Sequence, residues 1–343
     1  MSIEIPRPDD WHVHLRDGAM LASVVGHTAR SFGRALVMPN LSPPVTTVAL
    51  AEAYRERIRQ AQGDADFEAQ LTCYLTDGID PDEVVRGAQA GVWLAAKLYP
   101  AHATTGSSHG VTDIEGLDPV LAAMAGVGMP LCVHAEVTDP AVDIFEREHV
   151  FLDTKLTPLV ERHPTLKVVV EHATTARAVE FVREHDGRVA ASITPHHLWW
   201  NRNALFAGGL RPHAYCLPVL KTEHDRRALV EAATSGDSRF FAGTDSAPHE
   251  VATKECDHGC AGVFNAPTAL AAYAEVFAAA NALDKLGDFL SVHGARFYGL
   301  PVSEERVTIE ASPFAVPERI SIEGGGSVVP FLAGETLGYR ATD

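Results

Sequence analysis

The sequence predicts an α/β fold, a (β/α)8 TIM barrel with a short C-terminal extension. Eight short apolar runs, bounded by turn residues, alternate with amphipathic segments along most of the chain. The runs are nearly continuous in Val, Leu and Ala, which is typical of parallel strands buried on both faces. Each run and the segment that follows it are predicted to form one strand–helix unit, and eight such units close into a barrel.

The first expected strand carries the stretch Trp11-His12-Val13-His14-Leu15-Arg16-Asp17. Its histidines are two residues apart, so a strand would turn both imidazoles to one face. This arrangement suits two ligands of a single metal ion, although a half-exposed strand without a metal has the same pattern. The seven other expected strands cover residues 35–39, 69–75, 92–99, 130–135, 166–172, 188–194 and 239–244.

Three amphipathic segments between these runs are the clearest helices, at residues 48–62, 176–184 and 225–234. Their apolar residues recur at helical spacing with charge on the opposite face. After the eighth strand, residues 266–290 are expected to form a helix pair that closes the barrel. The alternative fold, an open doubly wound sheet, is disfavoured because no G-x-G-x-x-G follows the first strand.

The C-terminal part of the chain differs in composition, because it contains several prolines and the run Gly324-Gly325-Gly326. We therefore expect a metal-dependent barrel over residues 1–310. Residues 311–343 are expected to be an extended tail packed on the barrel.

Composition excludes several classes of protein. With 46% hydrophobic and 21% charged residues the chain is typical of a soluble globular protein, and a net charge of -17 disfavours nucleic acid as a partner. We find neither a membrane-spanning run nor a secretory signal, and expect a cytoplasmic protein. The five cysteines are scattered rather than paired, at positions 73, 132, 216, 256 and 260. A metal or redox role for Cys256-x3-Cys260 is the weaker reading.

Single ligand-type residues stand near the ends of the later strands. They are Lys97, His134, His172 and Asp245. Because strand ends converge at the mouth of a barrel, these residues should meet His12 and His14 there. Taken singly, each has an ordinary alternative: a hydrogen-bonded core histidine, a lysine that reaches to the surface, or an aspartate that caps a helix.

Several stretches together resemble the amidohydrolase superfamily with two metals and, within it, the dihydroorotases of the shorter, monofunctional bacterial type. They include W-H-V-H-L-R-D, K-L-Y-P-A-H-A-T-T, H-A-E, E-H-A-T-T, G-T-D-S-A-P-H and C-A-G-V-F-N-A-P-T-A-L. The resemblance covers nearly the whole chain. It implies reversible, zinc-dependent hydrolysis of the cyclic amide of (S)-dihydroorotate to N-carbamoyl-L-aspartate in de novo pyrimidine (UMP) biosynthesis, by a homodimer.

The resemblance also implies a role for each candidate residue. Two Zn²⁺ per chain would be held by His12, His14 and Asp245 on one side and by His134 and His172 on the other. Lys97 would bridge both ions as N6-carboxylysine, and Asp245 would carry the catalytic proton.

Substrate recognition follows the same resemblance. The substrate carboxylate would be held by Arg16, Asn40 and His249, while the backbones of Leu217 and Ala261 bond the ring. The implied substrate set also includes His134, and a flexible loop closes with Thr104 and Thr105. The adjacent His196 and His197 are assigned to packing and to contacts that support the site.

Other functions remain as alternatives. A related cyclic amidase, a hydantoinase or allantoinase, would share the metal ligands but needs no carboxylate clamp, so Arg16, Asn40 and His249 together disfavour it. Arg16 could instead form an ion pair with Asp10 or Asp17, and Asn40 could be a turn residue. A non-catalytic relative is disfavoured because all six ligand positions are filled.

Overall fold

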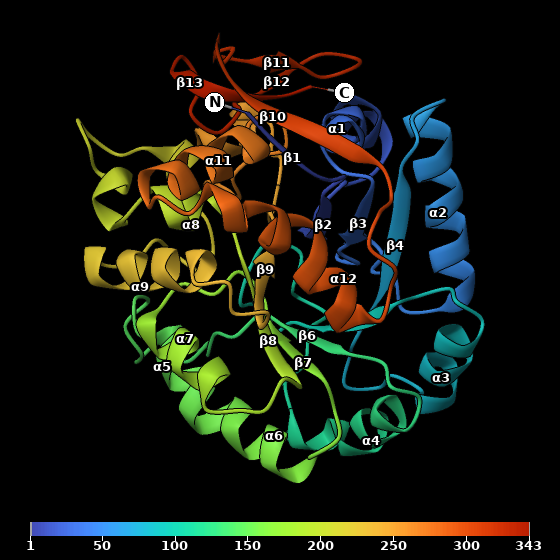
Figure 1. Ribbon diagram of the computed structural model, residues 1–343. Coiled ribbons are helices and arrows are strands. Elements are labelled where there is room, and N and C mark those ends of the chain that lie inside the picture. Colours follow the sequence, from blue (N-terminus) through green and yellow to red (C-terminus); the bar gives the residue numbers. More distant parts are fainter. Residues whose placement is uncertain (1, 343) are drawn as a thin grey trace.

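The eight predicted strands form one parallel sheet that closes into a barrel with the helices outside it (Figure 1). The computed structural model describes residues 2–342. Neighbouring strands follow the order of the sequence, and the predicted fold class is confirmed. The strands are β2 (Asp9–Val13), β3 (Arg34–Val37), β4 (Glu68–Tyr74), β5 (Ala95–Leu98), β6 (Leu131–Val133), β7 (Val168–Val170), β8 (Val189–Ile193) and β9 (Phe240–Ala242).

Alternate residues of a strand pack on opposite faces of the sheet, as β7 illustrates. Val169 belongs to an inner cluster with Cys132 and Phe241. Val168 and Val170 belong to the main core between the sheet and the helices. All three valines are fully buried, which explains why these runs are apolar at every position.

The barrel closes where β2 meets the segment that follows β9. Asp245 N donates to His12 O over 2.8 Å, and His14 N donates to Ser246 O over 3.0 Å. The fully buried Asp10 carboxylate reinforces this seam. It accepts hydrogen bonds from Thr244 N (2.8 Å), Thr244 Oγ1 (2.6 Å) and His12 N (3.1 Å). Backbone and side-chain hydrogen bonds therefore join the first and last strands.

The outer helices begin at side-chain caps that the sequence supplies. Thr47 Oγ1 accepts from Leu50 N at the start of α2, and Thr222 and Asp225 form a capping box at the start of α9. The helices are α1 (Gly18–Ser31), α2 (Val48–Gln62), α3 (Pro81–Gln89), α4 (Asp118–Gly126), α5 (Arg147–Phe151), α6 (Thr157–Arg162), α7 (Ala176–Arg183), α8 (Pro195–Trp199), α9 (Glu223–Thr234), α10 (Val251–Lys254), α11 (Ala269–Ala279) and α12 (His293–Tyr298). The predicted helix 48–62 matches α2, and the other two predicted helices differ from α7 and α9 by one or two residues.

The two ends of the chain share a second sheet beside the barrel (Figure 1). β1 (Ser2–Pro6) and β13 (Thr336–Thr342) flank β10 (Arg306–Ala315), all antiparallel. A short hairpin, β11 (Ile320–Ser321) and β12 (Ser327–Val328), lies between β10 and β13 in the sequence. The boundary expected at residue 310 falls within β10, and the sequence reading did not find β1.

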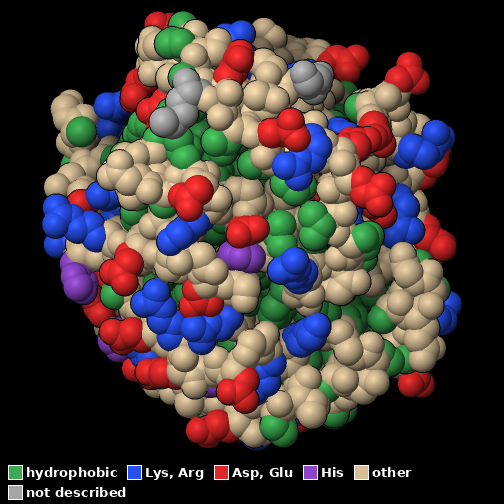
Figure 2. Space-filling view, viewed as in Figure 1, with side chains coloured by type: hydrophobic (Ala, Val, Ile, Leu, Met, Phe, Trp, Pro, Cys, Tyr) green, Lys and Arg blue, Asp and Glu red, His purple; other side chains and the backbone are tan. Residues whose placement is uncertain are grey.

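Charged side chains of both signs are interspersed on the face shown in Figure 2. This is the pattern expected of outer helices that turn their apolar side to the barrel. Within residues 2–342, none of the helices combines the length and the apolar character that crossing a membrane requires.

We expect Asp10→Ala to lower the free energy of unfolding by about 3 kcal/mol, because three buried donors lose their acceptor. Asp10→Asn should cost less than half as much, since one oxygen remains for the two backbone donors. Chemical denaturation midpoints measure both effects. Asp66→Ala is the control, because the Asp66 side chain is 83% exposed; equal shifts for Asp10→Ala and Asp66→Ala would contradict the role of the seam.

Candidate metal centre

The six ligand-type residues of the sequence meet at one end of the barrel, and all six are buried. His12 and Lys97 lie within β2 and β5. His14 and His134 directly follow β2 and β6, whereas His172 and Asp245 come two and three residues after the ends of β7 and β9. The structure thus brings together residues that are up to 233 positions apart in the sequence.

One group consists of His12, His14 and Asp245. The two Nε2 atoms are 3.3 Å apart, and Asp245 Oδ1 lies 3.3 Å from His12 Nε2 and 3.1 Å from His14 Nε2. Burial lowers the pKa of His14 to about 4 and also lowers that of His12. Burial alone would raise the pKa of Asp245, but the two histidines outweigh it and hold this pKa well below its ordinary value. Two neutral imidazoles and a carboxylate are a donor set that suits a divalent cation.

A second group consists of His134, His172 and Lys97. His134 Nδ1 lies 3.2 Å from His172 Nε2, and burial lowers the pKa of both rings. The His12 and His172 ring centroids are 5.0 Å apart, so the two groups adjoin. Lys97 Nζ contacts Glu171 Oε2, and burial lowers the pKa of Lys97 to about 7. The second group therefore offers two imidazoles and an amine close to its neutral form.

The outer ring nitrogens face acceptors that the sequence reading did not assign. His134 Nε2 bonds Glu136 Oε2 over 2.8 Å, and His14 Nδ1 bonds Asn40 Oδ1 over 2.8 Å. His12 Nδ1 lies 3.0 Å from Glu171 Oε1. An acceptor at the outer nitrogen holds the ring proton there and leaves the inner nitrogen with its lone pair. The inner nitrogens are the ones that converge.

Three residues at this mouth adopt the left-handed backbone conformation that favours glycine. The φ angles are 60° at Arg16, 43° at His172 and 46° at Asp245. Such conformations cost about 1 kcal/mol or more and cluster at functional sites. β7 and β9 end two and three residues before His172 and Asp245.

A small pocket opens beside these groups. Its lining includes most of the residues expected on the substrate side: Arg16, Asn40, Thr104, Thr105, His134, Leu217 and Ala261. His249 contacts the pocket through Arg16, whose Nη2 donates to His249 Nε2 over 2.9 Å. Tyr99, Ala247 and Gly262 also line the pocket and were not expected.

The alternative partners of Arg16 are engaged elsewhere. Asp17 pairs with Arg57 over 2.9 Å, and Asp10 bonds Thr244 in the barrel seam. Arg16 Nε donates to Pro248 O over 3.1 Å. The guanidinium is therefore directed to the pocket and not into an ion pair with a neighbour in the sequence.

The loop after β5 lies over the pocket. Asn40 Nδ2 donates to Thr105 O over 3.1 Å, and Thr105 Oγ1 reaches Ala261 O at 3.5 Å. Ser107 Oγ bonds both the N and the O of Thr104. A separate and larger cavity, about 620 Å³, borders the base of the loop and Glu136.

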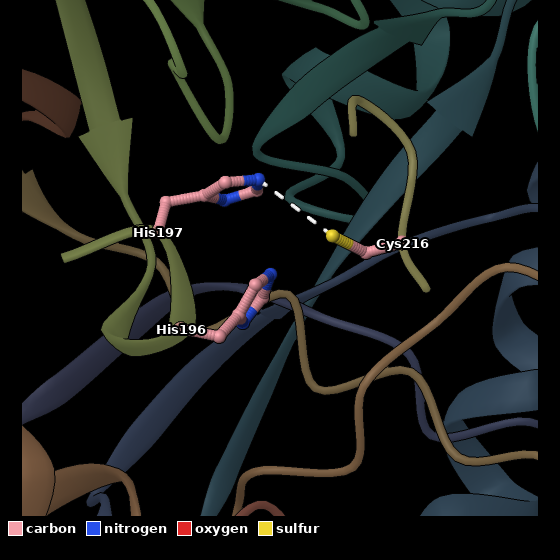
Figure 3. Close-up of side chains that lie close together, drawn as sticks. All are labelled: His196, His197 and Cys216. Atoms are coloured by element: carbon pink, nitrogen blue, oxygen red, sulfur yellow. Dashed lines mark hydrogen bonds between the residues drawn. The ribbon is translucent and has the colours of Figure 1, made fainter. Parts of the chain in front are cut away.

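A third cluster of potential ligands, His196, His197 and Cys216, is shown in Figure 3. Cys216 Sγ lies 3.7 Å from His197 Nε2. However, Asn265 Nδ2 donates to Thr244 O (2.7 Å) and to His196 Nδ1 (3.1 Å). The neutral His196 ring then carries its proton on Nε2, the atom that faces the cluster, and has no lone pair there for a metal. We keep the packing assignment for this pair of histidines.

Glu136 and Glu171 are the functional residues that the sequence reading missed. Glu136 stands two positions after a strand-end histidine, and Glu171 directly follows three valines. A carboxylate within a fully buried run needs a polar partner, and its presence in an apolar run is the sequence signal that indicates a functional role. The sequence pattern does not show which ring nitrogen each carboxylate faces.

The fold and the site of this chain have counterparts among known proteins. A model of the amidohydrolase family matches residues 9–305. The chain is 58% identical over 339 residues to a protein named dihydroorotase from Sphingopyxis alaskensis, covering 98% of each chain. It is 57% identical over 342 residues to a dihydroorotase from a Synechococcus species, covering 99% of this chain and 97% of the relative.

Solved structures give the same result. The dihydroorotase from Saccharomyces cerevisiae in complex with 5-fluoroorotic acid has a TM-score of 0.93 and 32% identity, covering 99% of this chain and 98% of that one. A dihydroorotase from Campylobacter jejuni has a TM-score of 0.91 and 34% identity, covering 100% and 98%. An L-hydantoinase from Arthrobacter aurescens, at 16% identity and a TM-score of 0.82 over 99% and 83%, shares the fold.

We expect Glu136→Ala to weaken metal binding by roughly 10- to 100-fold, because the His134 ring loses the acceptor that orients it. Glu136→Gln should restore part of the affinity, since its carbonyl can still accept the Nε2 hydrogen. Competitive metal titration measures both. Glu146→Ala, an exposed residue of the same loop, is the matched control, and an affinity for Glu136→Ala equal to that of this control would rule out the orienting role.

Proposed function

We propose that this chain interconverts (S)-dihydroorotate and N-carbamoyl-L-aspartate in de novo pyrimidine (UMP) synthesis. The premise is that it belongs to the amidohydrolase family and, within it, to the dihydroorotases. It is a hydrolase of a cyclic amide. The observation that carries the proposal is the Arg16 guanidinium, which lines the same pocket as the histidines His14, His134 and His172. A cation at this position complements the ring carboxylate of dihydroorotate.

Two zinc ions fit the donor set of this chain. His12, His14 and Asp245 would hold one ion, and His134 with His172 the other. The support is the convergence of the inner ring nitrogens, which lie 3.3 Å apart in the first group and 3.2 Å apart in the second. When bound, the ions would polarise the ring carbonyl and lower the pKa of a water.

We propose that Lys97 is N6-carboxylysine and bridges the two groups. Its amine is fully buried, and its low pKa gives access to the neutral form, which is the form that adds to CO₂. Carboxylation would turn a cation into an oxygen ligand, which removes its repulsion from two dications. Glu171, which now contacts the amine, would stay as the acceptor for His12.

Asp245 is the proposed proton carrier. Its carboxylate is held in the ionised form by His12 and His14 and lines the pocket. It would accept the proton of the attacking water and pass it to the ring nitrogen that leaves.

The remaining pocket residues would bind and enclose the substrate. Arg16, Asn40 and His249 are proposed for the carboxylate, and the Leu217 and Ala261 backbones for the ring, with His134 close to the reacting carbonyl. For Asn40 this requires exchange of its hydrogen bond to Thr105 O. Exchange of that bond would couple substrate binding to movement of the loop.

The loop with Thr104 and Thr105 is proposed as a lid. Both residues line the pocket, and Ser107 braces Thr104 from inside the loop. Closure would exclude water and add hydroxyl donors near the developing charge.

A homodimer and a cytoplasmic location are further proposals. Phe206 and Leu210 are apolar side chains that are 62% and 76% exposed, and an interface between two copies could bury them.

The proposed reaction is tested by Asp245→Asn in the metal-loaded enzyme. We expect turnover of dihydroorotate to fall by about two or more orders of magnitude, because the general acid–base group is lost. Metal content is measured on the same samples. If turnover stays within a few-fold of wild type with both ions present, Asp245 is not the proton carrier; if wild-type protein with both ions does not hydrolyse dihydroorotate, the function itself is wrong.

We expect Arg16→Met to impair dihydroorotate far more than an uncharged cyclic amide of the same ring size. Loss of the charge-assisted hydrogen bonds should lower kcat/KM for dihydroorotate by roughly 10- to 100-fold, that is about 1.5–3 kcal/mol. Steady-state kinetics with the two substrates provide the comparison. Equal losses for both would show that Arg16 acts on the structure of the pocket and not on the carboxylate.

A further inference from the structure

Lys254, the last residue of α10, makes an unusual set of hydrogen bonds. Its Nζ donates to three backbone oxygens, Tyr215 O (2.9 Å), Cys260 O (2.9 Å) and Gly262 O (2.7 Å). The residue is only 3% exposed. An ammonium has three hydrogens, so all of them are committed to carbonyls. Within residues 2–342 this lysine forms no ion pair with a carboxylate, and a buried cation kept without one calls for a functional reason.

The three carbonyls belong to the two segments that carry the expected ring-binding backbones. Tyr215 precedes Leu217 by two residues, and Cys260 and Gly262 flank Ala261. The segments are also joined directly, because Gly262 N donates to Tyr215 O over 3.0 Å. Lys254 therefore lies at the junction of two loops that come from different strand–helix units.

The direction of one donor follows from peptide geometry. In a planar trans peptide, a carbonyl and the N–H of the next residue point in opposite directions. Since Cys260 O is directed at Lys254, the N–H of Ala261 must point away from it. Gly262 O is held by Lys254 in the same way, and Gly262 N donates to Tyr215 O. The two peptides that flank the Ala261 α-carbon and the peptide after Gly262 are therefore all hydrogen-bonded and cannot rotate freely.

The donors concerned are available to a ligand. Leu217 and Ala261 both line the pocket. In the part of the chain that the structure describes, neither N–H donates to a backbone or side-chain acceptor. Two unused donors at the wall of a small pocket are what a ring with carbonyl and carboxylate oxygens requires.

We propose that Lys254 is a positioning residue for substrate recognition: its three hydrogen bonds fix the Leu217 and Ala261 segments so that their N–H groups meet the substrate. The proposal rests on the proposed function, because it takes dihydroorotate as the ligand. Lys254 touches neither the substrate nor the metal groups; it acts through the two loops. Misdirected donors would weaken binding more than they slow the chemical step.

The test compares Lys254→Met, Lys254→Arg and the control Lys167→Met in enzyme loaded with zinc. Methionine keeps the length of the stem and removes every donor. Arginine keeps the charge, but its planar fork cannot reproduce three converging bonds. Lys167 is a matched lysine that also donates to a carbonyl, Phe297 O over 3.0 Å, from the position before β7 at the other end of the barrel.

We expect Lys254→Met to raise KM for dihydroorotate by about tenfold or more, with kcat changed less and two metals retained, as for the loss of one or two hydrogen bonds. Lys254→Arg should recover only part of this, and Lys167→Met should keep the wild-type KM. Hydrogen exchange of residues 215–217 and 260–262 should be faster in Lys254→Met and unchanged in Lys167→Met.

Three results would overturn the proposal: wild-type KM in Lys254→Met, full recovery in Lys254→Arg, or a loss of kcat at unchanged KM. Full recovery would mean that the charge acts and not the hydrogen-bond geometry. If Lys254→Met does not fold, Lys254→Arg decides, because wild-type exchange and wild-type KM in that variant would refute a role for the three bonds. Wild-type turnover of dihydroorotate tests the proposed function separately, and the exchange measurement does not depend on turnover.

Discussion

The closure of the barrel between β2 and the segment after β9 is the constraint on which the site depends. The bonds from Asp245 N to His12 O and from His14 N to Ser246 O set two histidines and an aspartate side by side. Asp10 stabilises the same junction from within the barrel through Thr244. Without this seam the first and last strands would be edges, and residues 12 and 245 would have no fixed relation.

Within the closed barrel, a hydrogen-bond acceptor at the outer nitrogen sets the tautomer of His134 and of His14. Glu136 and Asn40 accept from His134 and His14, and Glu171 faces His12. Glu136 follows the same strand as His134, and Asn40 follows β3, the neighbour of β2, whereas Glu171 follows β7 on another part of the barrel. The hydrogen bonds of Glu136 and Asn40 place the ring protons of His134 and His14 outward and leave two lone pairs directed at the centre, which is the preorganisation that a metal site needs.

The substrate side is built differently, from loops tied to one another. Arg16 at the pocket wall is hydrogen-bonded to His249, Asn40 holds the loop of Thr105, and Lys254 joins the loops of Leu217 and Ala261. The barrel rim thus combines the proposed metal ligands near strand ends with the proposed recognition groups on cross-linked loops. Such a division lets loops adapt to a substrate while the ligand geometry stays fixed.

The sequence by itself determined the barrel, the eight strands and the six ligand-type residues. Strands buried on both faces are apolar throughout, as in Val168–Val170, and the single polar residues near their ends stand out against them. The helix over residues 48–62 was equally accessible, because its cap and its apolar period are local features. The motifs quoted in the sequence analysis resemble those of the dihydroorotases, and this resemblance indicated the family. The amidohydrolase match and the dihydroorotase relatives confirmed it.

Only the tertiary structure decided the relations between distant segments. β1 was not found because its partner β10 lies some 300 positions away, and pairing of that range leaves no local pattern. The contact of Glu171 with Lys97 and that of Lys254 with Tyr215 likewise join different strand–helix units. Residue type and spacing show which groups can act, whereas the direction of a ring nitrogen or a backbone N–H is fixed by partners that closure of the barrel brings into contact.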